Sequence, residues 1–117
     1  MLPKENRIKK KKDFELIFKN SKSFKNNIIV FKIAKNKLGL NRFGFVVSQK
    51  VSKKAVLRNK IKRRLSEIFK TEINKIKIGT DLILIALPGI EKKPLLEIKE
   101  SIVDILIKAN LIESSKK

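Results

Sequence analysis

The strongest constraint on the fold is the run of six apolar residues at positions 82–87, Leu-Ile-Leu-Ile-Ala-Leu. Such a run, with Gly79 before it and Pro88-Gly89 after it, is typical of a β-strand. Successive side chains of a strand point to opposite sides of the sheet, so an unbroken apolar run is expected to be buried on both faces. The chain should therefore form a sheet in which this strand is covered.

Two further strands are predicted earlier in the chain. Residues 28–34 are β-branched or aromatic apart from Lys32 and the final Ala34, and Lys32 is the one polar residue of the run. Residues 43–48 form a second strand-like run. The segment between them, Lys-Asn-Lys-Leu-Gly-Leu-Asn at 35–41, supplies Asn and Gly for a turn. We expect the two strands to pair as a hairpin, with room for a further short strand around residues 46–51.

Three helices complete the pattern. The first follows the basic residues 7–12, and one face of it carries three apolar side chains at helical spacing: Phe14, Ile17 and Phe18. The second and longest has Ser52 as its expected N-cap, runs to about Ile76 and ends before Gly79. Residues 19–25 between the first helix and the first strand are a polar break.

The last helix is expected to begin at Pro94, a residue suited to the first helical position. Its core-facing side chains would be Leu95, Ile98, Ile102, Leu106 and Ala109. A frayed Ser-Ser-Lys-Lys tail follows. Together these elements predict an α+β fold in α-β-β-β-α-β-α order, a two-layer sandwich of a mixed four-stranded sheet with helices packed on one side of it. At 117 residues, we expect a single domain over 1–117.

The charge balance points to a polyanionic partner. The chain has 30 Lys and Arg against 11 Asp and Glu, which gives a net charge of +19 and an isoelectric point near 10.4. A folded domain tolerates this self-repulsion most easily when it binds nucleic acid or an anionic membrane surface. A genome-wide base bias that favours Lys, Asn and Ile would explain part of the Lys excess, but it does not explain clustered arginines.

Several kinds of site are excluded by composition. The chain has no Cys and no His, which removes thiolate nucleophiles, imidazole bases, Cys/His zinc sites and disulfides. No apolar run reaches the length of a signal peptide core or of a membrane span. We therefore expect a cytoplasmic protein with no membrane partner and no metal site of its own.

The long predicted helix holds three of the five arginines of the chain. On a helical wheel of about 100° per residue, a core stripe comprises Leu57, Ile61, Leu65 and Ile68. Beside it lies a continuous polar ridge: Arg58, Asn59, Lys62 and Arg63. Arg64 points away from this ridge, and no acidic residue occurs between Lys53 and Ser66.

This ridge suits a phosphate backbone. Arg presents a planar fork of donors that matches phosphate bidentately, and Asn adds a donor and an acceptor beside it. The arrangement indicates a fixed contact to folded RNA or DNA. The alternative is a solvated helix face whose charges only keep the protein soluble, although such a face would normally carry acidic residues as well.

The ridge also carries a family resemblance. Arg58-Asn59-Lys60-Ile61-Lys62-Arg63 resembles the Arg-Asn-x-x-Lys-Arg signature of the protein subunit of bacterial ribonuclease P. Further matches follow in the right order over nearly the whole chain: Asn6 to Lys10 with Asp13, Phe14 and Phe18, then Arg42 to Phe45 with Val47 and Ser48, and the strand from Asp81 to Ala86. The chain departs from the pattern at Ser66, where the family usually has Arg, and in the Lys50 to Lys54 turn, which lacks the usual Gly. Lys70, one turn on, would extend the ridge instead.

The resemblance implies a left-handed crossover through the long helix and a defined division of labour. A large catalytic RNA removes the 5′ leader of precursor tRNA, while the protein binds this RNA, holds the single-stranded leader and promotes productive binding of Mg²⁺, which is held mainly by the RNA and the substrate. No catalytic residue and no obligate protein partner are expected. The implied contacts to the catalytic RNA are Arg58, Asn59, Lys62, Arg63, Lys54, Ser66, Lys70 and Arg7. The implied leader cleft consists of Phe14, Phe18, Lys32 and Ser48.

Alternatives remain open at this point. Phe14 and Phe18, four residues apart, are equally well explained as core residues. A basic ribosomal protein has the same size, charge and class of partner. A helix-turn-helix regulator fits less well because strands precede the long helix, and a protein-only nuclease would lack catalytic groups.

Overall fold

The computed structural model describes residues 2–112 of the chain. The tail for which fraying is predicted lies outside the described residues. The helices are α1 (Lys11–Asn20), α2 (Ala55–Glu72) and α3 (Leu95–Lys108), with short 3-10 helices η1 (Lys4–Asn6), η2 (Ile73–Lys75) and η3 (Ile90–Lys92). The strands are β1 (Lys22–Lys25), β2 (Ile29–Lys35), β3 (Arg42–Val46) and β4 (Thr80–Ala86).

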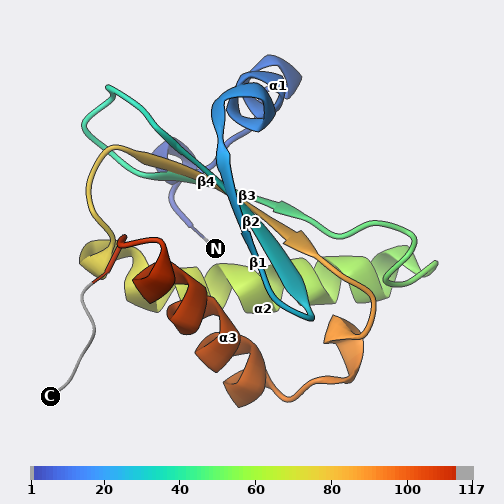
Figure 1. The fold of residues 1–117 in the computed structure, drawn as a ribbon. Helices are drawn as coiled ribbons and strands as arrows, with labels where there is room; N and C mark the ends of the chain where they lie inside the picture. The colour runs from blue at the N-terminus through green and yellow to red at the C-terminus, as the bar shows by residue number, and fades with distance from the viewer. Residues whose placement is uncertain (1, 113–117) are drawn as a thin grey trace, which may run out of the picture.

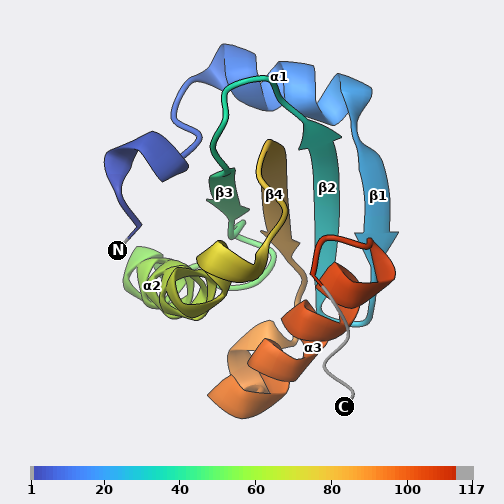
Figure 2. The same cartoon turned by 90° about the vertical axis from the view of Figure 1, so that its left-hand side faces the viewer.

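The four strands form one mixed sheet in the order β1-β2-β4-β3 (Figure 2). β4 pairs antiparallel with β2 and parallel with β3, and the parallel connection from β3 to β4 runs through α2. The predicted α+β class, the mixed four-stranded sheet and the α-β-β-β-α-β-α order are confirmed.

The predicted pairing of the first strands is wrong in detail. β2 and β3 do not form a hairpin, because β4 lies between them and bonds to both. The hairpin is instead β1 with β2, in which Phe24 lies opposite Phe31. β1 falls within the polar break at 19–25, and residues 47–54 form turns rather than the further strand expected around 46–51.

Helices cover the sheet on both faces. α2 and α3 lie under it, whereas α1 crosses the opposite face, an arrangement that the prediction of helices on one side did not include (Figure 1). The burial of β4 follows from this. Leu82 and Leu84 face the main core, Ile83 faces α1, and all three are fully buried, as the apolar run predicts.

The main core is centred on Phe69 of α2, whose ring lies 5.1 Å from the ring of Phe43 and 6.1 Å from that of Phe31. α3 contributes the buried residues Ile98, Ile102 and Leu106, as predicted. Leu95 was expected in the core but is half exposed. Pro94 is the N-cap rather than the first residue of α3, so Leu95 stands at the very start of the helix, before its buried face begins.

Candidate nucleic-acid interface

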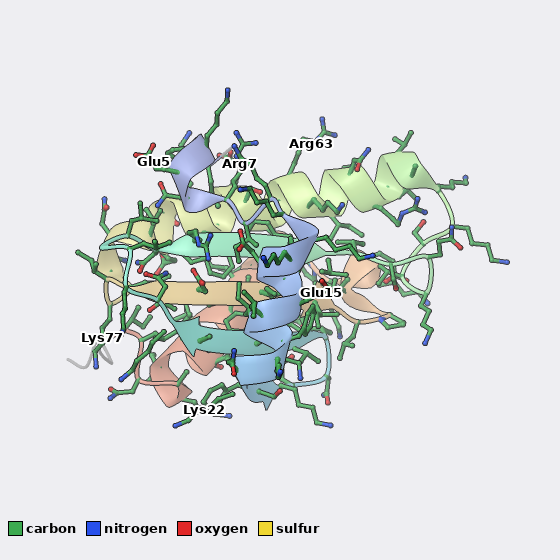
Figure 3. All side chains as sticks on the ribbon, turned by 90° about the horizontal axis from the view of Figure 1, so that it is seen from above. Glu5, Arg7, Glu15, Lys22, Arg63 and Lys77 are labelled. Carbon is green, nitrogen blue, oxygen red and sulfur yellow. The ribbon has the colours of Figure 1, made fainter. Side chains whose placement is uncertain are left out.

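The first turns of α2 extend past the end of β3 (Figure 3). The N-cap is Lys54 and not Ser52, whose hydroxyl oxygen instead accepts a hydrogen bond from the Lys54 amide, 3.2 Å away. Because the sheet does not reach this end of the helix, Leu57 is 41% exposed, and its predicted place in the core stripe is wrong. Ile61, Leu65 and Ile68 are buried as predicted.

The ridge of Arg58, Asn59, Lys62 and Arg63, called the cationic ridge from here on, lies on this protruding half of α2. Asn59, Lys62 and Arg63 are exposed, and Arg58 is half buried. Nη1 of Arg58 donates a hydrogen bond to the carbonyl oxygen of Ser52. Within residues 2–112, none of the ridge cations is paired with a carboxylate; the ion pairs there involve Arg42, Lys75 and Lys93. The ridge therefore keeps its positive charge available to a partner.

Other residues predicted to extend the ridge are placed unequally. Lys54 and Lys70, near the two ends of α2, are both exposed, as is Arg64 on the other flank. Ser66 is only 6% exposed, so its expected position in the middle of an exposed ridge is wrong. The N-terminal segment lies beside this part of α2 (Figure 2), and its Leu2 shares the core cluster with Leu65 and Phe69.

Arg7 belongs to this N-terminal segment. It forms a parallel β-bridge with Phe43, and the next amide, of Ile8, donates a hydrogen bond to the Phe43 carbonyl at 2.9 Å. Arg7 is half buried, and its Nε has no hydrogen-bond partner among the described residues. The N-terminal segment therefore places one more Arg beside the β3 edge of the sheet, where α2 also lies (Figure 3).

The two aromatic residues of α1 differ in their surroundings. Phe14 is half buried against Gly44 of β3: a Cβ atom at Gly44 would lie 2.7 Å from Cε1 of Phe14. The missing side chain of Gly44 therefore makes room for the Phe14 ring. Phe18, one helical turn further, is 42% exposed. Phe14 is a packing residue, whereas Phe18 leaves much of its ring accessible.

Next to α1, part of the sheet face that this helix crosses is not fully covered. Val46, Ile85 and Val30 form one row across β3, β4 and β2, and all three are half buried. We call this row the open strip. Lys25 lies opposite Val30 at its end, and Lys32, half buried, stands one row closer to α1 with its Nζ donating to the Ser23 hydroxyl. Ser48, exposed, lies two residues beyond Val46.

The buried carboxylate of Asp81 is the centre of a hydrogen-bond network at the edge of the sheet face that α1 crosses. Asp81 is 4% exposed and accepts hydrogen bonds from Nε and Nη2 of Arg42 at 2.9 and 2.8 Å and from Nδ2 of Asn36 at 2.7 Å. Nη1 of Arg42 also donates to Oδ2 of Asp13 on α1, 3.3 Å away. The hydrogen bond to Asp81 raises the pKa of Arg42 above its ordinary value. Sequence reasoning missed this network, although an Asp immediately before a fully apolar strand was a signal for a buried partner.

The helices of residues 2–112 include none that is long and apolar enough to cross a bilayer. Nor do the acidic side chains in that range gather into a group of three or more that would hold a metal ion. The cationic ridge and the open strip are the two surfaces that the site residues define.

Comparison with known proteins gives consistent matches. A family model described as Ribonuclease P matches residues 2–110. The ribonuclease P protein component of Clostridium botulinum strain 657 is 37% identical over 109 residues, which are 92% of this chain and 97% of that protein. The RNase P protein of Staphylococcus aureus superposes with a TM-score of 0.84 at 37% identity, covering 92% of this chain and 98% of that one. That of Thermotoga maritima superposes with a TM-score of 0.79 at 32% identity, covering 87% and 96%.

Proposed function

Because the chain belongs to the ribonuclease P protein family, we propose that it is the protein subunit of a ribonucleoprotein whose RNA removes the 5′ leader from precursor tRNA. Family membership itself makes the chain a subunit of a tRNA-processing endoribonuclease and implies an RNA partner. It also decides against the rival interpretation as a ribosomal protein. The proposal adds which surface meets which RNA.

The cationic ridge binds the catalytic RNA in this proposal. The observation that carries it is the exposure of Asn59, Lys62 and Arg63 on a protruding helix, with no carboxylate of residues 2–112 paired to the ridge cations. A bidentate guanidinium is best suited to phosphate when it is not already engaged by an acid. Lys54 and Lys70 lengthen this contact along α2, and Arg7 extends it to the neighbouring segment. Ser66 is left out because it is buried.

The open strip and Phe18 receive the single-stranded leader. Half-buried Val30, Val46 and Ile85 supply an apolar floor, and the exposed ring of Phe18 supplies a surface on which a base can stack whatever its identity. Lys32 on β2 and Ser48, two residues beyond the end of β3, would contact the sugar-phosphate backbone of the leader. Tolerance of sequence suits a substrate class whose leaders differ.

The chemistry belongs to the RNA. The chain has neither His nor Cys, so the commonest general bases and the thiolate nucleophile are lacking. Mg²⁺ ions would be held by phosphates of the RNA and the substrate, and the protein would help by holding the leader where those phosphates meet. We place this ribonucleoprotein in the cytoplasm, with no obligate protein partner.

Reconstitution tests the proposal. The protein is combined with the cognate catalytic RNA at low Mg²⁺, and release of a 5′ leader from precursor tRNA is scored. We expect cleavage that needs both components, and co-sedimentation of the protein with a particle smaller than a ribosomal subunit. Equal cleavage with and without the protein, or sedimentation with ribosomal subunits, would contradict the assignment.

A further inference from the structure

We propose that Asp13 is a positioning residue for leader binding, because its contact with Arg42 sets the roll of α1 on the sheet and so directs Phe18 toward the open strip. This inference rests on the proposed function. It concerns a residue that touches neither RNA nor leader in the proposed arrangement.

Few contacts of α1 fix its orientation on the sheet. It has ten residues, its N-cap Lys10 makes no side-chain capping bond, and Ile17 is its only buried residue. A helix this short is marginal without tertiary contacts. Its C-terminal end is tied by the chain to β1, which begins two residues later. Its N-terminal end depends on what the first turn contacts.

The contacts of the first turn lie on both sides of Ile17. With Ile17 facing the sheet, helical geometry places Asp13 about 40° to one side and Phe14 about 60° to the other, with Phe18 about 100° round on the side of Phe14. Asp13 meets Arg42, and Phe14 meets Gly44. The two contacts therefore oppose rolling in opposite directions. Loss of the Asp13 contact frees α1 to roll about Ile17, and this roll moves Phe18.

Arg42 is a rigid anchor for Asp13. Two of its nitrogens are bonded to Asp81, which is buried in the sheet, and the third reaches α1. The contact can be removed from the α1 side while the Arg42–Asp81 pair is kept. The side chain of Asp13 is 29% exposed, so replacing it buries no new unsatisfied group deep in the core. The effect of Asp13 on the position of α1 can thus be measured separately from its effect on the stability of the protein.

The test compares Asp13→Asn with Glu15→Gln in the reconstituted ribonucleoprotein. Glu15 is exposed on the same helix (Figure 3), and both substitutions remove one negative charge, so their general effects on RNA affinity are matched. The measured quantity is the ratio of affinities for precursor tRNA with a leader and for the same tRNA without one. We expect Asp13→Asn to lower this ratio about three- to tenfold and Glu15→Gln to leave it unchanged. Asp13→Glu, which keeps the carboxylate, should lower the ratio less than Asp13→Asn does. Affinity for the catalytic RNA should be the same in Asp13→Asn and Glu15→Gln.

The outcomes separate the two claims. An Asp13→Asn ratio equal to that of Glu15→Gln overturns the positioning role, and so does a lower midpoint of thermal unfolding with an unchanged ratio. If the wild-type ribonucleoprotein itself binds the two tRNAs equally, the leader-binding part of the proposed function fails, and the positioning role fails with it.

Discussion

Nη1 of Arg58 donates a hydrogen bond to the carbonyl oxygen of Ser52, 3.0 Å away. The bond joins the first turn of α2 to the loop before it, where the hydroxyls of Ser48 and Ser52 also accept hydrogen bonds from nearby amides. Arg58 is therefore oriented before any RNA arrives, and it uses only one of its five donors to achieve this. The remaining donors stay available, so one side chain fixes the loop and offers a fork to phosphate.

Arg58→Lys separates these two contributions of Arg58. Lys keeps the charge but lacks the planar fork, and its single ammonium cannot serve the Ser52 carbonyl and a phosphate in the same geometry. We expect the free energy of unfolding to fall by about 0.5–1.5 kcal/mol, measured by urea denaturation. Affinity for the catalytic RNA should fall as well, but by less than in Arg58→Ala. Wild-type affinity in the Lys variant would show that charge alone matters at this position.

Phe14 and Phe18 should respond differently to truncation. Phe14→Ala removes a ring packed on Gly44 and should cost about 2–3 kcal/mol of stability. Phe18→Ala removes a ring that is 42% exposed, so its stability should change by less than about 1 kcal/mol, while affinity for a leader-bearing precursor tRNA falls by about 1–3 kcal/mol. Denaturation and binding measured on both variants check this. A leader affinity that Phe18→Ala leaves intact would assign the ring no part in leader binding.

Asp81→Asn should be among the most destabilising single changes in the sheet. The carboxylate accepts three hydrogen bonds from Arg42 and Asn36, whereas an amide would turn an NH₂ group toward one of these donors and leave the cation of Arg42 without its buried partner. We expect a loss of about 3 kcal/mol. The control is Asp104→Asn, exposed on α3, with a change within about 0.5 kcal/mol. Equal effects of the two would mean that the network contributes no more than a surface charge.

Gly44→Ala tests how closely α1 packs on β3. The added methyl group would meet the ring of Phe14 at 2.7 Å, so α1 must shift or Phe14 must leave its position. We expect a cost of about 1–3 kcal/mol. The double variant with Phe14→Leu should recover part of it, because the smaller side chain gives way. A fully additive double variant would argue against direct contact.

The local patterns predicted the elements better than their pairing. β4 was evident from its apolar run, and such a strand, buried on both faces, needs a neighbour on each side to bond its backbone. In the structure these neighbours are β2 and β3, and the position of β4 between them excludes the hairpin suggested by the turn at 35–41. β1 was missed because three of its four residues are polar, as suits an edge strand that has a partner on one side only.

The site was predictable only where helix geometry decides it. The wheel grouped Arg58, Asn59, Lys62 and Arg63 from directions that depend on α2 alone; in the structure Asn59, Lys62 and Arg63 are exposed and Arg58 is half buried. It misplaced Leu57 and Ser66, because their burial depends on where the sheet ends and where the N-terminal segment runs. The sequence of α2 alone does not determine where the sheet ends or where the N-terminal segment runs. The link from Asp13 through Arg42 to Asp81 joins three distant segments, and spacing along the chain gave no indication of it.

The most direct test of the cationic ridge compares Arg63→Ala with Arg64→Ala. The two arginines are adjacent and both exposed, but they point to different sides of α2, so the variants differ in geometry and not in charge. Affinity for the catalytic RNA is measured over a range of salt concentrations. We predict that Arg63→Ala weakens binding about tenfold and lowers the slope of log K against log salt by about 0.7–1, while Arg64→Ala changes both much less. Equal losses in the two variants would contradict the account, since they would show that total charge and not the ridge binds the RNA.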